Sequence, residues 1–599
     1  MTSPPTPPTE RRIVVLTGIA VLIAAGAGVA AKVLIALIDF ITNLSFFGHL
    51  SFAPASPATN HLGAAVVIIP LIGAFVVGLM ARFGSAAIRG HGIPEVMERV
   101  LLNESRISPR LTILKPLSTA ISIGTGGPFG AEGPIIATGG ALGSVAGQLL
   151  RITADERKTL LAAGGAAGMA ATFGSPVSAV LLAVELLLFE YRARSLIPVA
   201  FAAATATGVR FAFGGGVPMF AIPQLAQPTG LALTAYIAIG GIVGLASVGV
   251  TRAIFVIEDA FDRLPFHWMW WPMLGAIVVG VVGFAEPRTL GVGYDNISHI
   301  LSGDIAGKAL VALVVLKFVS WSIALGSGTS GGTLAPLFTI GGGLGALLGV
   351  AALSVPALHV DPHVAALVGM AAIFAGASRA LLASVVFAFE TTRQPIGLLP
   401  LLAGCSAAYL ISLQLMRTTI MTEKLARRGV RVGSDYSVDY LEQVPVIEIA
   451  TTDVVVLRTG DAVEEIRDWM AERAPGSTHQ GFPVIDEAGA LVGVVTRRNL
   501  LDLDLPIDSR VGELVRQPPI TIFEDDTARQ AADRMVHEGI GRLPVVSRSE
   551  PRTVLGIVTR SDLLDAHARR LDAAHRAVRH IEFLPSSWLR RPPNVDGVG

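Results

Sequence analysis

The sequence predicts an all-α, polytopic membrane domain of two repeated halves with broken helices, followed by a smaller soluble α/β region. Three observations support this. The 599-residue chain is 52% hydrophobic and 15% charged, and its mean hydropathy is +0.61. A glycine-rich segment at residues 123–143 recurs about 200 positions later, and the apolar segments end near Met416. Because an average soluble domain is about 25% charged, most of the chain is expected in a membrane.

The repeat is clearest in the glycine-rich segment. Eight of its residues recur 202 positions later: Gly124, Gly126, Gly130, Pro134, Gly139, Gly140, Leu142 and Gly143 match Gly326, Gly328, Gly332, Pro336, Gly341, Gly342, Leu344 and Gly345. Downstream, the segment GMAA and its phenylalanine recur after 201 residues, and each copy continues to a glutamate at the end of an apolar helix, Glu185 or Glu390. The chain therefore contains a duplicated unit of about 200 residues.

The apolar segments define the predicted membrane domain. Residues 1–12 are polar and proline-rich and are expected to form a disordered tail. The run 13–38 is long enough to span a bilayer. A signal peptide is the alternative, but the run is long and shows no obvious small-residue cleavage site. We place the membrane domain at 13–425, with repeats at about 13–213 and 231–420.

Several apolar segments are too short to span and start or stop at glycine or proline. Irregular backbone at membrane depth is tolerated only where protein buries it or where it lines a polar cavity. Such interrupted segments in matching repeats point to a transport site, and free amides at helix starts bind anions. The candidate loop-to-helix starts are GHGIP at 90–94, GAEGP at 130–134 and GGTLAP at 331–336. The alternative is that these glycines only allow close helix packing.

These segments carry a family resemblance. GHGIPEV, GPFGAEGPII, GSPVSAVLLAVE and GSGTSGGTLAPLF resemble the signature segments of the CLC family of chloride channels and proton-coupled chloride exchangers, over roughly residues 60–425. The resemblance implies transport of chloride or a similar small anion by a homodimer with one pathway in each subunit. It also implies two inverted halves with the ion held by helix N-termini. Both the coupled exchanger and the passive channel remain open.

The resemblance assigns roles to individual residues. Glu132 is the gate, and the backbone amides of Thr333 and Leu334 bind the central anion. A carboxylate is itself an anion, so it can occupy an anion site until chloride displaces it or a proton neutralises it; an acid inside the membrane is by default functional. The alternative for Glu132 is a capping acid at its own helix. The full set of expected anion-site residues is His91, Gly92, Ile93, Gly130, Ala131, Gly133, Thr333, Leu334 and Met421.

Four positions depart from the family pattern. His91 stands where serine is usual, and we expect it either to contact the anion or to turn away. Met421 replaces a tyrosine and donates no hydrogen bond. Leu186 replaces a second glutamate on the proton route, so protons need another group or water, or the protein is a passive channel. Ala131 replaces a basic residue before the gate. Selectivity among anions is therefore open.

After Met416 the composition changes to that of a soluble region. Four basic residues follow the last apolar run: Arg417, Lys424, Arg427 and Arg428. By the positive-inside rule, they place the C-terminal part in the cytoplasm. We expect the helices to lie in the inner membrane of the cell. Residues 445–505 and 511–570 are duplicates: FPVI at 482–485 matches LPVV at 543–546, and GVVTR at 493–497 matches GIVTR 63 residues on. This region resembles a pair of CBS domains.

In CBS pairs that bind adenine nucleotides, a threonine and an aspartate three residues on face the ribose and phosphate. The second copy keeps this pair as Thr559 and Asp562, whereas the first has Thr496 and Asn499. We therefore expect either an adenine nucleotide (ATP, ADP or AMP) at the second copy or a module that only packs against the rest of the protein. The tail 571–599 is helical at first and then proline-rich, and we assign it no role.

Other functional classes are not expected. The net charge is zero, which does not suggest nucleic acid, and the single Cys405 can form neither an internal disulfide nor a zinc site. An enzyme would need a reactive constellation within the membrane, and a cation transporter would need several acidic residues in the helices; neither pattern is found. No cofactor is required for the predicted transport.

Overall fold

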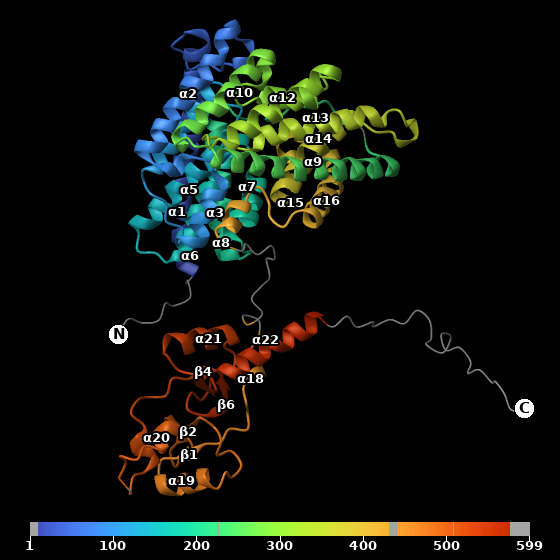
Figure 1. The fold of residues 1–599 in the computed structure, drawn as a ribbon. Helices are drawn as coiled ribbons and strands as arrows, with labels where there is room; N and C mark the ends of the chain where they lie inside the picture. The colour runs from blue at the N-terminus through green and yellow to red at the C-terminus, as the bar shows by residue number, and fades with distance from the viewer. Residues whose placement is uncertain (1–9, 226, 431–440, 442–443, 507, 576–599) are drawn as a thin grey trace, which may run out of the picture. The chain divides into compact units, whose positions relative to one another are not determined.

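The computed structural model describes residues 10–225, 227–430, 441, 444–506 and 508–575, and the chain divides into two compact units near residue 436. Each unit is described by itself (Figure 1). Residues 1–9 and 576–599, which include most of both expected tails, lie outside the described residues.

The first unit is helical. Its first repeat comprises α1 (Glu10–Thr42), α2 (Ile68–Leu79), α3 (Ile93–Leu102), α4 (Leu111–Gly124), α5 (Glu132–Leu149), α6 (Ala154–Phe173), α7 (Pro176–Leu182, extended by a π-helical turn Ala183–Leu188) and α8 (Ala193–Ala212). Its second repeat comprises α9 (Gly230–Asp262), α10 (Trp271–Ala285), α11 (Tyr294–Leu301), α12 (Gly307–Gly326), α13 (Leu334–Ala352), α14 (Pro362–Ser378), α15 (Leu381–Thr392) and α16 (Leu398–Leu415), and α17 (Glu423–Arg427) follows.

The helix lengths confirm a multi-pass membrane domain with broken helices. Within the described ranges, eight helices are long and apolar enough to cross a membrane. Four further apolar helices, among them α4 and α15, have only 10–17 residues. The helix α1 begins at Glu10, so residues 10–12 are helical where we expected a disordered tail. In this turn, Arg12 forms an ion pair with Glu156 of α6, which connects the start of α1 to a distant helix of the same unit.

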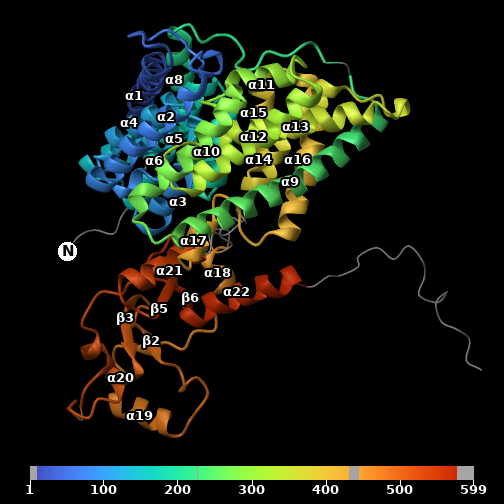
Figure 2. The same ribbon diagram turned by 45° about the horizontal axis from the view of Figure 1, so that its top comes forward.

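The two repeats pack alike. In the first, α5 packs on α6, and in the second, α13 packs on α14. Figures 1 and 2 show the helices of the first repeat, in blue to teal, beside those of the second, in green to gold. Glycine permits the close approach: a Cβ on Gly139 would lie 2.1 Å from the carbonyl oxygen of Gly164, and one on Gly341 would lie 2.5 Å from that of Gly369.

The second unit contains two small α/β halves, which confirms the predicted α/β region. The first half has β1 (Leu457–Arg458), α19 (Val463–Ala471), β2 (Gly481–Ile485), β3 (Leu491–Thr496) and α20 (Arg497–Leu500). The short helix α18 (Val446–Ile449) precedes β1 in the chain but packs in the core of the second half. The second has β4 (Ile522–Phe523), α21 (Ala528–His537), β5 (Arg542–Val546), β6 (Val554–Thr559) and α22 (Arg560–His575). In each sheet a parallel pair is followed by an antiparallel pair, in the orders β1-β2-β3 and β4-β5-β6.

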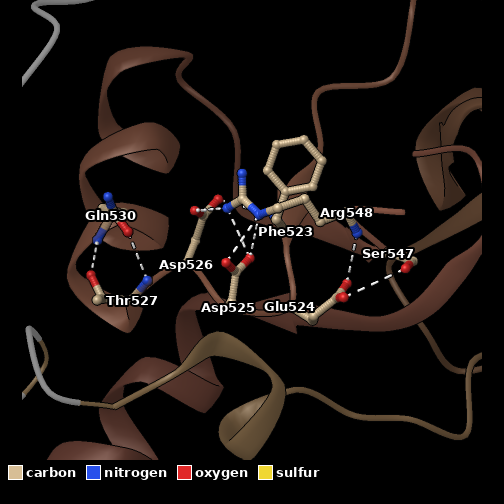
Figure 3. A network of polar contacts seen from close by, with 8 residues as sticks. All are labelled: Phe523, Glu524, Asp525, Asp526, Thr527, Gln530, Ser547 and Arg548. Carbon is tan, nitrogen blue, oxygen red and sulfur yellow. Dashed lines mark hydrogen bonds and ion pairs between the residues drawn. The ribbon is translucent and has the colours of Figure 1, made fainter. Parts of the chain in front are cut away.

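A surface network follows β4 (Figure 3). The Arg548 guanidinium lies 4.3 Å from the centre of the Phe523 ring and pairs with Asp525 and Asp526 at 2.8 and 3.0 Å. The Arg548 hydrogen bond holds the pKa of the Asp525 carboxyl below its usual value. This network joins the end of β4 to the loop after β5, next to the start of α21.

Candidate functional site

The three glycine-rich segments predicted as an anion site meet in the structure. Gly90 forms a bridge with Ser330, while Gly130 and Gly332 exchange two backbone hydrogen bonds of 3.1 and 2.8 Å. These contacts gather the N-termini of α3, α5 and α13 into one junction. Because the first four N–H groups of a helix lack intrahelical acceptors and carry partial positive charge, the junction presents donors suited to an anion.

The junction has the symmetry of the sequence repeat. Gly130 and Gly332 are 202 residues apart, so repeat-related residues pair with each other in antiparallel fashion. An antiparallel pair of equivalent residues has a local two-fold axis between the strands. The two halves therefore meet through equivalent elements, as the prediction of two inverted repeats requires.

A buried lysine supports the loops of each half. Lys115 of α4 and Lys317 of α12 are also 202 residues apart, and both are almost completely buried. Each Nζ donates to two main-chain carbonyls: Lys115 to Ile88 and Gly90 at 2.8 and 2.9 Å, and Lys317 to Thr289 and Gly291 at 2.9 and 3.1 Å. These bonds fix the loops that precede α3 and α11.

Two glycines make room for the junction. Gly92 has a φ of +96°, and a Cβ there would lie 2.4 Å from the carbonyl oxygen of Gly133. A Cβ on Gly130 would lie 1.7 Å from Oε2 of Glu132. Any side chain at these positions would displace the neighbouring loop or the Glu132 carboxylate.

Glu132 places its carboxylate in this junction. It is the first residue of α5 and is completely buried. Its Oε1 accepts a hydrogen bond of 2.8 Å from the Tyr294 hydroxyl. Its Oε2 makes no hydrogen bond within the described residues. A carboxylate thus lies among helix N-termini, where an anion is stabilised.

Two further buried polar atoms on these segments have no partner in the described part of the chain. They are Nδ1 of His91, which is 3% exposed, and Oγ1 of Thr333, which is fully buried. Unpartnered buried polar atoms are rare because each costs about 1–3 kcal/mol. With Oε2 of Glu132, they are three buried polar atoms on the glycine-rich segments that lack a hydrogen-bond partner within the described residues.

The hydrogen bonds within the protein also limit which backbone amides are free to donate to an anion. The N–H of Gly92 donates to Oε2 of Glu95 at 2.7 Å, and that of Gly130 donates to Gly332. In this structure these two amides are therefore already bonded within the protein, and the place of Gly92 and Gly130 in the anion site stays a prediction. Because they have no Cβ, Gly92 and Gly130 instead leave room for the Gly133 carbonyl and the Glu132 carboxylate.

The remaining expected residues lie in or next to the buried core. Ile93 and Leu334 are the first residues of their helices and are fully buried, so their amides remain candidate donors. Ala131 precedes α5, and Gly133 lies in its first turn. Met421 is also fully buried, in the same core as Leu334.

A cavity of about 580 Å³ reaches this region from one side. Its lining includes Gly90 and Gly92 at the start of α3 and the cations Arg89, Lys424 and Arg428. Two of these cations form ion pairs: Lys424 pairs with Glu258 at 3.2 Å, and Arg428 pairs with Glu98. The guanidinium of Arg89 instead lies over the rings of Trp268 and Trp271, 4.9 and 5.5 Å from their centres. The cavity gives a polar approach to the α3 N-terminus.

The two repeat-related glutamates cap each other's halves. Glu185 accepts hydrogen bonds of 3.0 and 3.1 Å from the first turn of α15, and Glu390 accepts bonds of 3.0 and 2.8 Å from the first turn of α7. This reciprocal pattern gives both carboxylates a structural role. Leu186, next to Glu185, is 3% exposed and brings no titratable group.

Three site residues were missed by the sequence reasoning. Lys115 and Lys317 could have been found, because they share the 202-residue offset of the repeat. Tyr294 could not, because the position 202 residues earlier is Gly92 and carries no related side chain. Only the tertiary structure places α11 against the N-terminus of α5.

In the second unit, Thr559 and Asp562 contact each other at the junction of β6 and α22. The N–H and Oγ1 of Thr559 donate to Asp562 Oδ2 at 2.7 and 2.8 Å. Thr496 and Asn499 form the equivalent contact in the first half. Both pairs cap the helix that follows, so they have a structural role irrespective of any ligand.

Comparisons with known proteins identify the family. The family model described as "Voltage gated chloride channel" matches residues 72–413, and the CBS domain model matches residues 446–505 and 511–569. The H(+)/Cl(-) exchange transporter ClcA of Vibrio parahaemolyticus is 30% identical over 393 residues, which cover 61% of this chain and 82% of that protein. The putative chloride channel protein ClcB-like of Ralstonia nicotianae is 26% identical over 366 residues, 60% of this chain and 85% of that protein.

A solved structure supports the fold. A slow cyanobacterial Cl⁻/H⁺ antiporter superposes with a TM-score of 0.61 at 23% identity, covering 71% of this chain and 98% of that one. The chloride channel model spans more than half of the 599 residues, and the 30% identical relative is matched over most of its length. The chain is therefore a multi-pass membrane protein of the CLC chloride channel and transporter family, with two CBS domains.

Proposed function

We propose that this protein moves chloride, or a similar small inorganic anion, through the junction of α3, α5 and α13, with Glu132 as the gate. The observation that carries the proposal is the completely buried Glu132 carboxylate at the meeting point of three helix N-termini. An anion entering the junction would compete with this carboxylate for the same donors. Because both are negative, occupancy by one disfavours the other.

The donors follow from the contacts. The amides of Ile93 and Leu334 begin their helices, and the buried, unpartnered atoms of His91 and Thr333 lie on the adjoining loops. Lys317 adds a buried positive charge that attracts Glu132. The gate opens when chloride displaces the carboxylate or when a proton neutralises it, because a neutral acid gains less from helix N-termini than a carboxylate does.

For the coupling we favour exchange of anions for protons, since opening by protonation gives Glu132 a route to carry a proton. The passive channel remains a second candidate because of one observation. Leu186 is buried where a proton-carrying acid would be expected, and it cannot carry a proton. Proton entry would then need water or another acid.

The test is flux from liposomes loaded with chloride, with chloride efflux and proton movement recorded together for wild type and Glu132→Gln. Proton uptake against its gradient, driven by chloride and abolished by the variant, supports exchange. Chloride efflux without proton movement supports the channel. Unchanged chloride and proton movement in Glu132→Gln would refute the gating role of Glu132. The variant His91→Ala is expected to weaken chloride binding if Nδ1 faces the anion.

For the second unit we propose adenine nucleotide binding in the half that holds Thr559 and Asp562. A carboxylate suits ribose hydroxyls. Calorimetric titration of the full-length protein with ATP, ADP and AMP tests this, with Thr559→Val expected to weaken binding. The matched control is Thr496→Val, which alters the equivalent threonine of the half that has Asn499. Equal effects of the two variants, or no heat for any nucleotide, would contradict the proposal.

We also propose that the protein is a homodimer in the inner membrane with its CBS domains in the cytoplasm. The family membership and the cluster of Lys424, Arg427 and Arg428 after the last membrane helix support this arrangement. Light scattering in detergent tests the dimer. Protease accessibility of the CBS domains in inside-out and right-side-out vesicles tests the orientation.

A further inference from the structure

The contact of Tyr294 with the gate is not part of the expected site. Tyr294 is the first residue of α11, follows Gly293 with a φ of +76°, and is only partly buried, whereas the Glu132 carboxylate that it touches is completely buried. Its hydroxyl is the one side-chain donor to Glu132 within the described residues.

The direction of the hydrogen bond follows from its acceptor. A carboxylate oxygen can only accept, so the Tyr294 hydroxyl donates its proton to Oε1 of Glu132 at 2.8 Å. A group that donates to a carboxylate oxygen in this position would also donate to a halide placed there, because both are anionic acceptors.

The aromatic ring is held in place independently of this hydrogen bond. Phe173 at the end of α6 meets the Tyr294 ring edge-on at 5.8 Å, and Phe220 lies 6.4 Å away at an interplanar angle of 60°. The loop before α11 is held by the two bonds from Lys317. The hydroxyl is therefore preorganised, which raises its value as a donor.

We propose, on the basis of the function proposed above, that Tyr294 is a positioning and specificity residue of the anion pathway. Its hydroxyl holds the Glu132 carboxylate in the closed gate and donates the same hydrogen bond to the anion that replaces this carboxylate. Met421 offers no hydroxyl at the position where the family usually has a tyrosine, so the hydroxyl donor of this chain comes from α11 instead.

The variant Tyr294→Phe tests the first part, since it keeps the ring contacts and removes only the hydroxyl. Without this donor the ionised carboxylate is less stable in the closed position, so it takes up a proton at higher pH. The other charged groups that face the pair, Lys317 and Arg210, are unchanged. We expect the pH of half-maximal chloride flux to rise by about one unit or more.

The second part is tested where the gate carboxylate is absent. In a Glu132→Ala background, chloride affinity measured by calorimetry is expected to fall about tenfold on adding Tyr294→Phe. The control is Tyr236→Phe, which removes another buried hydroxyl, one that accepts a 3.0 Å hydrogen bond from the Asp361 N–H. This control is expected to change neither the pH profile nor the affinity. Each variant is first checked for a monodisperse elution profile.

The outcomes separate the two proposals. If Glu132→Ala changes neither chloride flux nor its pH dependence, the proposed gate fails, and the role of Tyr294 fails with it. If Glu132→Ala alters flux but Tyr294→Phe leaves the pH profile or the chloride affinity unchanged, the gate stands and the role of Tyr294 is overturned. Equal effects of Tyr294→Phe and Tyr236→Phe would likewise overturn it.

Discussion

The close packing of α5 on α6 predicts a large effect of a single methyl group at Gly139. A Cβ there would lie 2.1 Å from the carbonyl oxygen of Gly164, whereas ordinary contact begins at 3.4 Å. The two helices would have to separate by more than ~1 Å, because the obstacle is backbone and cannot rotate away. Overpacking of this kind costs about 1–3 kcal/mol. We therefore expect Gly139→Ala to destabilise the membrane domain.

The matched control is Gly26→Ala. Gly26 is an exposed residue of α1, and a Cβ on it would meet nothing within 4 Å. Both substitutions gain about 0.5–1 kcal/mol of helix propensity. Their difference in the free energy of unfolding therefore isolates the overpacking term of about 1–3 kcal/mol. The assay is unfolding by sodium dodecyl sulfate in mixed micelles.

The same change is expected to displace Glu132, the proposed gate. Gly139 lies two turns after Glu132 on the same helix, so moving α5 away from α6 also moves the carboxylate out of the junction. Chloride flux of Gly139→Ala should fall, while that of Gly26→Ala should match wild type. Equal stability of the two variants would refute the argument that this glycine is needed for helix contact.

Three further predictions concern other contacts. Glu390→Gln and Glu185→Gln should each destabilise the protein by about 1–3 kcal/mol in the same assay. Each glutamate accepts one backbone hydrogen bond on each carboxylate oxygen, whereas the glutamine side chain has only one oxygen that can accept. An unchanged free energy of unfolding for both variants would contradict the capping role. Gly92→Ala should cost about 1–3 kcal/mol and abolish chloride flux, since its φ is +96° and its Cβ would meet the α5 backbone; wild-type flux would disprove this. The lowered pKa of Asp525 means that its pairing with Arg548 stabilises the protein above the ordinary carboxyl pKa of about 3.9 and is lost as the pH falls. The difference in thermal stability between wild type and Arg548→Met should therefore shrink below about pH 4, and a difference independent of pH would contradict the pairing.

Much of the fold could be predicted because the residues that recur between the two repeats are mostly glycines, and no other residue fits at a close backbone contact. Glycine is needed where helices or loops approach closely, so Gly139 and Gly341 retain the 202-residue offset. The same reasoning located the three helix starts of the site. The Glu185 and Glu390 caps were visible as a pair, but only the structure shows that each serves the other half.

The tertiary structure decided which hydrogen-bond donors face Glu132. A sequence pattern marks a helix start, but it does not say whether an amide is already bonded, as those of Gly92 and Gly130 are. Nor does it report contacts between segments 162 residues apart, such as that of Tyr294 with Glu132. A helix start depends on local backbone geometry, and a close helix approach requires glycine whichever helix is the partner, so both leave a pattern in the sequence. A hydrogen bond between distant segments depends on how whole helices pack, and it can be made by many residue types, so it leaves none.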